Sequence, residues 1–494
     1  MTEHFDVVVV GAGLSGIGAG YHLQTRCPDR SYVILEGREA LGGTWDLFRY
    51  PGIRSDSDMH TLGFSFRPWV DEKSIADGAT ILDYLNDTAR EYGIDRHIRL
   101  SHRVIAAQWS TPDAAWTVEA EHEGERVRFT CNFLFMCSGY YNYAAGYTPD
   151  FAGTDSFSGQ IIHPQFWPET LDYRDKRVVV IGSGATAVTL VPAMAKTASH
   201  VTMLQRSPTY IVSRPSRDVL ANWLCGKLPN RLAYSITRWK NVLIQQFFYR
   251  LTRKHPDKAK ARIIDMVRDE LGEGYDVDTH FTPSYDPWDQ RLCLVPDSDL
   301  FEEIRQERAE IVTGHIDRFT PDGIRLQDGR SLGADIIVTA TGLDLQLMSD
   351  IALTIDGEPV DAKHSLNYKG MMFSDIPNLA LSFGYTNASW TLKADLTAAY
   401  VCRLLNTMKR RGLRQCTPRV EGEVAEEPFL DFNSGYVLRA LDKFPRQGAT
   451  KPWRVNQNYL KDVLALRFGS VDDQMVFSNP APKVKSQKTA ADSR

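Results

Sequence analysis

The chain has 494 residues, which is enough for two or three domains with large hydrophobic cores. Its 57 Lys and Arg residues against 62 Asp and Glu residues give a formal net charge of −5, so the overall charge predicts no nucleic-acid partner. Seven scattered cysteines form no Cys-x-x-Cys pair, and we see neither a signal peptide nor an apolar run long enough to span a bilayer. We therefore expect a cytoplasmic protein without disulfide bonds or zinc.

A first dinucleotide-binding unit is predicted at the N-terminus. Residues 5–10 form a short β-branched run, typical of a strand buried in a parallel sheet, and the glycine loop of residues 11–16 (Gly-Ala-Gly-Leu-Ser-Gly) follows at once. Helical periodicity over 14–26 leads to a second strand over 31–35, which ends in Glu36. This is the complete βαβ fingerprint, in which glycines let a pyrophosphate approach the helix N-terminus.

The acid at the end of the second strand indicates which nucleotide this unit accepts. The Glu36 carboxylate can accept hydrogen bonds from ribose hydroxyls and repels a 2′-phosphate, which favours FAD or NAD over NADP. Ser15 lies at the helix N-terminus, where its hydroxyl can donate to a phosphate. The residues expected to hold the dinucleotide are Gly11, Gly13, Ser15, Gly16 and Glu36. The alternative is a glycine turn that binds no ligand.

The first unit continues with further segments that are typical of FAD folds. A glycine pair at residues 42–43 follows the acid, as is common where a chain passes close to the cofactor. A strand is expected over 103–109, in which Val104 matches the place where such folds meet adenine through the backbone. A buried strand over 133–139 that ends in glycine closes this segment.

Residues 157–168 read Phe-Ser-Gly-Gln-Ile-Ile-His-Pro-Gln-Phe-Trp-Pro. This F-x-G-x-x-x-H-x-x-x-W-P spacing resembles the fingerprint of the Baeyer–Villiger monooxygenases, flavoenzymes that insert one oxygen atom of O2 beside a carbonyl. Residues 42–56 resemble a second signature of that family, G-G-x-W-x-x-x-x-Y-P-G-x-x-x-D. We interpret the first stretch as a hinge between two nucleotide domains, and we expect His163 to satisfy local hydrogen bonds rather than transfer protons.

A second unit of the same kind is predicted over 177–207. A buried strand over 177–181 precedes a second glycine loop and an apolar helix, and the next strand, over 200–204, leads to Arg206 and Ser207. A guanidinium pairs well with phosphate, so this unit is expected to select NADPH over NADH; an ordinary surface arginine is the alternative. The residues expected to contact NADP here are Ser183, Gly184, Ala185, Thr186, Ala187, Val188, Thr189, Arg206 and Ser207.

Residues 214–268 interrupt the α/β rhythm with a stretch rich in cations and aromatic side chains. It contains 13 Lys and Arg residues against 3 Asp and Glu residues and is predicted to be a helical insertion in the NADPH domain. Three interpretations stay open: a basic helical face in water, a patch on a membrane surface, or a subunit contact in a homo-oligomer. Peripheral contact with the inner membrane surface is therefore one alternative to a purely cytoplasmic location.

The family resemblance implies roles for individual residues. Thr44, Trp45, Asp46 and Leu47 would line the flavin and Asp56 would lie beside its ring, with a solvated loop acid as the alternative for Asp56. Arg54, Ser55 and Asp56 would also contact NADP. Arg291 matches the family arginine that reaches the flavin, and Gln290 stands where many members carry lysine, which weakens one phosphate contact. A structural ion pair is the alternative for Arg291.

The expected fold is α/β, with two Rossmann-like dinucleotide-binding domains, one for FAD and one for NADPH. The expected division is a first FAD segment over 1–145, an NADPH domain over 146–342 that includes the linker 157–168 and the insertion at about 214–280, a second FAD segment over 343–480, and a flexible tail over 481–494. Near residues 384–393 we expect a loop that leads into a helix under the flavin.

No redox cysteine pair is present, which argues against disulfide reduction and leaves simple reduction and oxygenation as flavin chemistries. The resemblance implies an NADPH-dependent monooxygenase that converts ketones and O2 into esters or lactones and also S-oxygenates sulfides or thioamides. Arg291 and Asp56 would be its catalytic residues. The alternatives are an N- or S-hydroxylating flavin monooxygenase and a non-catalytic NADPH-sensing flavoprotein.

Overall fold

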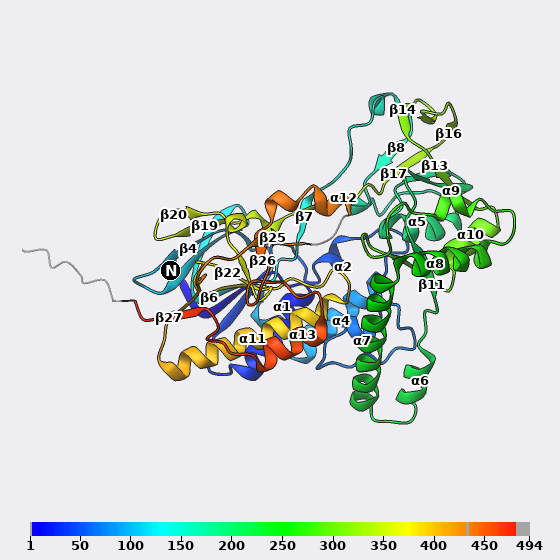
Figure 1. The fold of residues 1–494 in the computed structure, drawn as a ribbon. Coiled ribbons are helices and arrows are strands. Elements are labelled where there is room, and N and C mark those ends of the chain that lie inside the picture. Colours follow the sequence, from blue (N-terminus) through cyan, green and yellow to red (C-terminus); the bar gives the residue numbers. More distant parts are fainter. Residues whose placement is uncertain (1, 431–433, 481–494) are drawn as a thin grey trace, which may run out of the picture.

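The computed structural model of the chain describes residues 2–430 and 434–480 and shows a mixed α/β protein with two large sheets (Figure 1). One sheet has nine strands and the other has five parallel strands. Each sheet contains a parallel strand that leads directly into one of the two glycine loops, which confirms the predicted fold class. The tail that we predicted to be flexible, 481–494, lies outside the described residues.

The nine-stranded sheet carries the first glycine loop. Its β1 (Glu3–Val10) lies between β2 (Tyr32–Leu35) and β6 (Glu125–Met136) and runs parallel to both. The flanking strands β3 (Ile98–Arg99) and β23 (Leu379–Leu381) extend this parallel half on either side. The second half of β1, residues 7–10, and all of β2 are buried, and the residues there are all apolar, as the sequence indicated.

The other half of this sheet is largely antiparallel. The amino-terminal part of β6 pairs with β5 (Ala115–His122), which pairs with β4 (Arg103–Ser110), and β19 (Ala352–Ile355) and β20 (Glu358–Val360) complete the edge. Alternate residues of β5 point into the core, so that Trp116 on β5 packs beside Trp109 on β4 and both side chains are fully buried. This half gives the first domain a second hydrophobic core, on the face away from α1.

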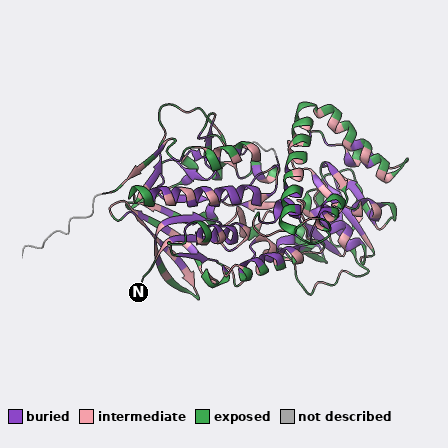
Figure 2. Cartoon of the chain, turned by 90° about the horizontal axis from the view of Figure 1, so that it is seen from below, coloured by how far each residue is buried: buried purple, intermediate pink, exposed green. Residues whose placement is uncertain are grey.

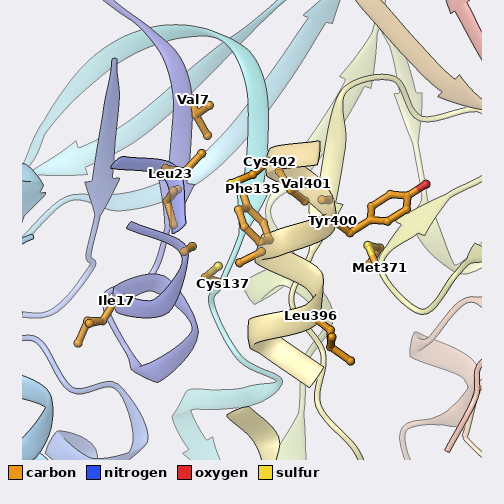
Figure 3. Close-up of a cluster of buried hydrophobic side chains, with 14 of the residues drawn as sticks. Val7, Ile17, Leu23, Phe135, Cys137, Met371, Leu396, Tyr400, Val401 and Cys402 are labelled. Atoms are coloured by element: carbon orange, nitrogen blue, oxygen red, sulfur yellow. The ribbon is translucent and has the colours of Figure 1, made fainter. Parts of the chain in front are cut away.

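Two long helices cover the other face of the sheet. The first, α1 (Leu14–Arg26), starts at the glycine loop, and α11 (Trp390–Arg411) packs against it. Figure 3 shows side chains of both helices gathered in one apolar cluster with Phe135 of β6. The start of α11 at Trp390 confirms the helix expected after the loop near residue 384.

The five-stranded sheet has the order β13-β10-β9-β17-β8. Its strands are β13 (Ala309–Thr313), β10 (His200–Gln205), β9 (Arg177–Ile181), β17 (Ile336–Thr339) and β8 (Gln160–Ile162). Both α5 (Ala185–Ala195), which follows the second glycine loop, and α10 (Asp299–Arg305) pack beside it in a separate core. Buried residues are therefore concentrated around the two large sheets, with exposed residues on the outer helices (Figure 2). We call the part built on the nine-stranded sheet the first body and the part built on the five-stranded sheet the second body.

The predicted helical insertion is confirmed and contains α6 (Val219–Cys225), α7 (Asn230–Lys254), α8 (Pro256–Leu271) and α9 (Val277–Phe281). In Figure 1, α6 and most of α7 extend below the five-stranded sheet. The inner face of α7 packs on α3 (Met59–Leu62), which belongs to the other body. No helix in the described ranges 2–430 and 434–480 is long and apolar enough to cross a membrane.

Shorter elements complete the described chain. The remaining helices are α2 (Thr44–Leu47), α4 (Gly78–Glu91), α12 (Gly435–Leu438) and α13 (Tyr459–Val463), the 3₁₀ turns η1 (Asp95–His97), η2 (Thr154–Ser156), η3 (Pro164–Phe166), η4 (Leu347–Asp350), η5 (Ala362–His364) and η6 (Leu441–Lys443), and the π-helical turn η7 (Leu464–Phe468). The remaining strands pair as β7 (Tyr141–Gly146) with β18 (Leu343–Leu345), β11 (Ile211–Arg214) with β12 (Cys293–Pro296), β14 (Ile316–Thr320) with β15 (Gly323–Leu326) and β16 (Ser331–Gly333), β21 (Asn367–Tyr368) with β22 (Met372–Phe373), β24 (Gln415–Pro418) with β27 (Met475–Ser478), and β25 (Glu426–Pro428) with β26 (Arg446–Gly448).

Candidate functional site

One continuous cavity of about 1050 Å³ joins the two glycine loops. Its walls come from the carboxyl ends of parallel strands in both sheets, where open α/β sheets bind their ligands. The predicted residues that line it are Gly11, Gly13, Ser15, Glu36, Thr44, Trp45, Arg54, Ser55, Asp56, Val104, Ser183, Gly184, Ala185, Thr186, Thr189, Arg206, Ser207 and Arg291. A single space therefore brings together most of the residues chosen from the sequence.

The first glycine loop has the shape of a cradle for a pyrophosphate. Gly11 has φ +101°, and a Cβ there would lie 2.7 Å from the carbonyl oxygen of Cys137, so only glycine fits. A Cβ at Gly13, in contrast, would meet no protein atom closer than 3.5 Å. Because packing does not require glycine at position 13, the space beside it suits a ligand that approaches the backbone.

The Ser15 hydroxyl is held by two side chains from the second part of the first domain. It accepts a hydrogen bond from the indole nitrogen of Trp390 at 2.8 Å and another from the Ser382 hydroxyl at 3.1 Å. Both contacts use the Ser15 oxygen as an acceptor, so its proton can still be donated to a ligand at the start of α1. The Trp390 ring stacks on Tyr140 with ring centroids 5.1 Å apart, which gives the cavity an aromatic wall.

Glu36 is fixed by the backbone of the loop that it faces. One carboxylate oxygen accepts from the amide of Ala12 at 2.7 Å and the other from the amide of Arg38 at 2.9 Å. Burial raises the pKa of the Glu36 carboxyl above its ordinary value, and these two amides oppose that shift. The arrangement presents a hydrogen-bond acceptor at the end of β2, where a ribose would lie.

The second glycine loop repeats this geometry in the five-stranded sheet. Gly182 has φ +137°, and a Cβ there would lie 2.3 Å from the carbonyl oxygen of Ala340. A Cβ at Gly184 would meet no atom within 4 Å, so this position also leaves room for a ligand. Ser183 donates its hydroxyl to the carbonyl of Ser207 at 3.1 Å, which ties the loop to the end of β10.

The specificity positions of the two units differ in charge. Arg206 follows β10 and lines the cavity with an exposed side chain, and no carboxylate of the described residues lies within ion-pairing distance of it. Glu36 occupies the matching position in the first unit. An unneutralised guanidinium at the end of the second strand suits a phosphate group, as the sequence indicated.

Arg291 and Asp56 form an ion pair inside the cavity. Nε of Arg291 lies 3.0 Å from Oδ2 of Asp56, and Nη2 lies 3.1 Å from Oδ1, so the guanidinium is gripped at two points. The negative charge of Asp56 raises the pKa of Arg291 further above its ordinary value. Arg291 comes from the second body and Asp56 from the first, so the pair joins the two bodies across the cavity.

Five predicted residues do not line the cavity: Gly16, Asp46, Leu47, Ala187 and Val188. A Cβ at Gly16 would lie 1.8 Å from the carbonyl oxygen of Gly11, so this glycine serves the close packing of helix on strand. Asp46 is buried between Arg38 and Arg49, each 2.6 Å away, and Ala187 and Val188 lie in the core of the second body. Arg54 lines the cavity, but its guanidinium is already paired with Asp299 at 2.5 Å.

The helix α12 supplies cavity residues that the sequence did not reveal. The Tyr436 phenol lies beside Arg291, and burial raises its pKa above its ordinary value. The Arg439 guanidinium lies 3.5 Å over the centroid of the Tyr147 ring. Burial lowers the pKa of Arg439, and the nearby charge of Arg206 lowers it further. The only hint in the sequence is the spacing of Tyr436 and Arg439, an aromatic and a cation three residues apart, and this pattern is too common to predict a site.

His163 lies outside the cavity and makes local contacts. Its Nδ1 accepts from the backbone amide of Gln165 at 3.2 Å, so Nε2 carries the proton and faces the carbonyl of Gly342 at 3.3 Å. Burial lowers the pKa of His163, which favours this neutral form. These contacts fit the expected local role and join the linker to the strand connection at residue 342.

Sequence comparisons find close relatives that cover the whole chain. A family model described as flavin-binding monooxygenase-like matches residues 57–266, and one described as NAD(P)-binding Rossmann-like domain matches residues 9–72. The FAD-containing monooxygenase EthA of Mycobacterium tuberculosis is 58% identical over 486 residues, covering 98% of this chain and 99% of that protein.

Structural comparisons point to the same architecture. An oxidised steroid monooxygenase bound to NADP matches with a TM-score of 0.71 at 23% identity, covering 84% of this chain and 88% of that one. Cyclohexanone monooxygenase with ε-caprolactone bound matches with a TM-score of 0.71 at 22% identity, covering 84% and 90%. At these identities the likeness shows a shared fold.

Proposed function

The chain belongs to the family of FAD-containing flavin monooxygenases, and from that premise we propose that it uses NADPH and O2 to convert ketones into esters or lactones. The observation that carries this proposal is the Arg291–Asp56 ion pair in the cavity that joins both glycine loops. Two nucleotide cradles that open into one space allow electrons to pass between two cofactors. A cation in that same space gives the site a way to stabilise negative charge on oxygen.

The two cofactors divide between the two cradles. When bound, FAD would supply the redox chemistry that activates O2, with NADPH as its reductant. The open spaces at Gly13 and Gly184 fit the two pyrophosphates, and Glu36 fits a ribose that carries no 2′-phosphate. Arg206 and Ser207 would hold the 2′-phosphate of NADPH.

Arg439 is proposed as a second cation for that phosphate. Gln290 lines the cavity where many relatives of this type carry lysine, so one positive charge is missing from the side of residue 291. Arg439 directly follows α12, in the other body, and lines the same cavity as Arg206, with its guanidinium 3.5 Å over the centroid of the Tyr147 ring. Two like charges that line one cavity repel each other, so an anion bound between them is stabilised by both charges and removes their repulsion.

Arg291 would act on the charge that develops on oxygen during the reaction. A unit positive charge at ~4 Å, with an effective dielectric constant of about 20, stabilises a negative charge by roughly 4 kcal/mol. That energy corresponds to about three pKa units, and it is an upper bound for Arg291 because the Asp56 carboxylate offsets part of the charge. Asp56 holds the guanidinium in place from two sides and reduces its net charge.

S-oxygenation of sulfides or thioamides is a second proposed activity at the same site. A sulfur nucleophile attacks electrophilic oxygen and does not need an anionic oxygen group, so it depends less on Arg291 than a ketone does. The fingerprint at 157–168 supports the ketone activity, and one cavity that holds both cofactors can serve either substrate. An N-hydroxylating enzyme and a non-catalytic NADPH sensor are the rivals.

The test is a product analysis with the purified holoprotein. Cyclohexanone, methyl phenyl sulfide and a tertiary amine are incubated separately with NADPH and air, while NADPH loss and products are quantified. We expect lactone from the ketone and sulfoxide from the sulfide, each in proportion to NADPH consumed. Amine oxide without lactone would support the hydroxylating rival. NADPH oxidation that yields only hydrogen peroxide with every substrate, including a panel of longer ketones, would support the sensor.

A further inference from the structure

The helix α7 is apolar on two opposite faces. Its inner face, with Ala233, Tyr234, Thr237 and Val242, is buried against the first body and the neighbouring helices. Its outer face carries a stripe of large apolar side chains at helical spacing, and all of them are exposed: Leu232, Ile236, Trp239, Leu243 and Phe247. The neighbouring Ile244 and Phe248 and, on α6, Val219, Leu220 and Trp223 are exposed as well. We call these ten residues the outer stripe.

Exposure of this size needs an explanation. Phe247 is 62% exposed and Trp223 is 58% exposed, whereas single exposed apolar residues elsewhere are ordinary for soluble proteins. A contiguous set of such residues marks a surface that is covered by something else. The inner face of α7 already packs the helix against the protein. Within the outer stripe, Trp239 also contacts the first body, since its ring centroid lies 5.8 Å from that of Tyr459.

The charges around the outer stripe indicate what covers it. The 25 residues of α7 include six Lys and Arg residues and no Asp or Glu. Arg238 is buried, Lys240 pairs with Asp218 and Arg253 with Asp289. The other three, Arg231, Arg250 and Lys254, are exposed, and no carboxylate of the described chain lies within 4.0 Å of them. The partner surface is therefore apolar and negatively charged.

We propose that α6 and α7 bind the surface of a bilayer that contains anionic phospholipids, with the outer stripe inserted among the upper acyl chains. Tryptophans and phenylalanines with leucines on one face and flanking cations are the composition of a helix that lies in a membrane interface. Each basic residue near such a surface is attracted to the lipid phosphates. Because no helix in the described part of the chain can cross a bilayer, the contact is peripheral.

A second copy of the chain fits the outer stripe less well than lipid does. Two copies of α7 that meet along this face would place Arg250 and Lys254 near cations of the other copy. These are Arg250 and Lys254 again in a parallel pair and Arg231 in an antiparallel pair, and neither helix has an acid to offset them. An anionic bilayer satisfies the apolar stripe and the cations together. This contact is independent of which substrate the cavity accepts.

The test is cosedimentation of the holoprotein with sucrose-loaded vesicles. Vesicles of equal parts phosphatidylglycerol and phosphatidylcholine are compared with pure phosphatidylcholine at low and at high salt. We expect the protein to bind the vesicles that contain phosphatidylglycerol at low salt. Binding should be weaker to these vesicles at high salt and weaker to pure phosphatidylcholine vesicles at either salt concentration. The double substitution Trp239→Ser with Phe247→Ser is expected to abolish binding, and Arg250→Gln with Lys254→Gln to weaken it about fivefold per cation removed.

Val476→Ser is the matched control, since Val476 is an exposed apolar residue on β27, far from the insertion in sequence. It should bind vesicles like the unaltered protein. The thermal unfolding temperature of each variant reports whether folding is intact. It should change little for Arg250→Gln with Lys254→Gln and fall slightly for the Trp239 variant, because the Trp239 ring contacts Tyr459. Equal binding of the unaltered protein and the Trp239/Phe247 variant would overturn the proposal. A second outcome would also overturn it: light scattering shows a dimer in the absence of lipid, the Trp239/Phe247 variant is a monomer, and neither protein binds vesicles.

Discussion

At the scale of single residues, three of the arginines that line the cavity differ in whether a carboxylate pairs with them. Arg291 is gripped by Asp56, Arg54 is occupied by Asp299, and Arg206 faces the cavity without a carboxylate among the described residues. An arginine that is already neutralised is a poor phosphate ligand, so the three guanidiniums are suited to different tasks. We propose that Arg206 recognises phosphate, that Arg54 makes a fixed contact between the two bodies, and that Arg291, whose charge Asp56 offsets only in part, stabilises negative charge on oxygen.

Substitution of Arg291 separates reduction from oxygenation. Arg291→Ala should still allow NADPH to reduce the flavin, because hydride transfer does not need the negative charge on oxygen that Arg291 would stabilise. Ketone oxidation should fall by up to roughly three orders of magnitude, since up to about 4 kcal/mol of charge stabilisation is lost. Stopped-flow measurement of flavin reduction and quantification of lactone check both halves. Arg291→Lys keeps a charge without the two-point grip and should retain part of the activity. Normal ester formation by Arg291→Ala would disprove the role.

Cofactor selectivity tests the two arginines that share the proposed phosphate site. Arg206→Ala should raise the KM for NADPH about tenfold or more while changing the KM for NADH little, because only NADPH carries the 2′-phosphate. Arg439→Ala should shift the same ratio in the same direction by a smaller factor. Arg446→Ala, at an exposed arginine on β26, serves as the control and should leave both values unchanged. Equal increases for the two cofactors would contradict the assignment of this site.

Residues that act within one local motif were predictable, and residues brought in from distant segments were not. Gly11, Gly13, Gly184, Glu36, Arg206 and Arg291 each belong to a glycine loop, a strand end or a family signature, and all six line the cavity. Arg439 lies 233 residues after Arg206, directly after a four-residue helix, so nothing in sequence spacing connects the two. Asp46 matched a family signature, yet two arginines bury it away from the cavity.

At the scale of elements, the linker joins the two bodies through side-chain contacts as well as through the chain itself. The strand β8 joins the edge of the five-stranded sheet beside β17, and η3 follows it directly. The His163 ring packs so closely on Gly146 of β7 that a Cβ there would lie 2.0 Å from it. Strand periodicity predicted the buried strands well, because an all-apolar run has few alternatives. It could not show where short edge strands such as β7 and β18 pair, since pairing depends on the tertiary fold.

The neutral form of His163 makes the linker sensitive to pH. Because burial lowers its pKa, the unfolded chain binds a proton here at a higher pH than the folded chain does. The free energy of unfolding should therefore decline as pH falls below about 6.5, by at most ~1.4 kcal/mol per pH unit from this group. His163→Gln should be less stable at pH 8 but lose less stability between pH 7 and pH 5. Denaturant unfolding across this range checks it, and parallel profiles for both proteins would contradict the prediction.

At the scale of the whole molecule, the insertion connects the two bodies. Arg238 on α7 is buried, and its Nη1 faces the carbonyl oxygens of His60 at 2.9 Å, Thr61 at 3.2 Å and Gly63 at 2.8 Å. Its other terminal nitrogen lies 3.7 Å from Asp395 of α11. The basic composition of residues 214–268 predicted helices, but it could not distinguish this one buried arginine from its exposed neighbours.

Removal of Arg238 should loosen the insertion from the first body. Arg238→Met leaves Asp395 and three carbonyl groups short of a buried partner, which should cost ~3–5 kcal/mol. Hydrogen exchange should rise along α7 and α3 while the strands of both sheets stay protected. Arg231→Met, at an exposed arginine on the same helix, should change the free energy of unfolding by less than about 0.5 kcal/mol. Similar losses for the two variants would show that Arg238 is not a bridging residue.

The inner face of α7 has a consequence for how reactants are supplied. Val242 packs on Tyr385, and Gln245 donates to the carbonyl of Asn387 at 3.1 Å, in a loop whose Tyr385 and Ala388 border the cavity. The outer stripe is thus separated from the cavity by α7 itself, which is about 10 Å across, and by this one loop. If the outer stripe is inserted in a membrane, long-chain substrates dissolved in the lipid lie close to the cavity. The rate of their oxidation would then depend on how strongly they partition from water into the membrane rather than on their solubility in water.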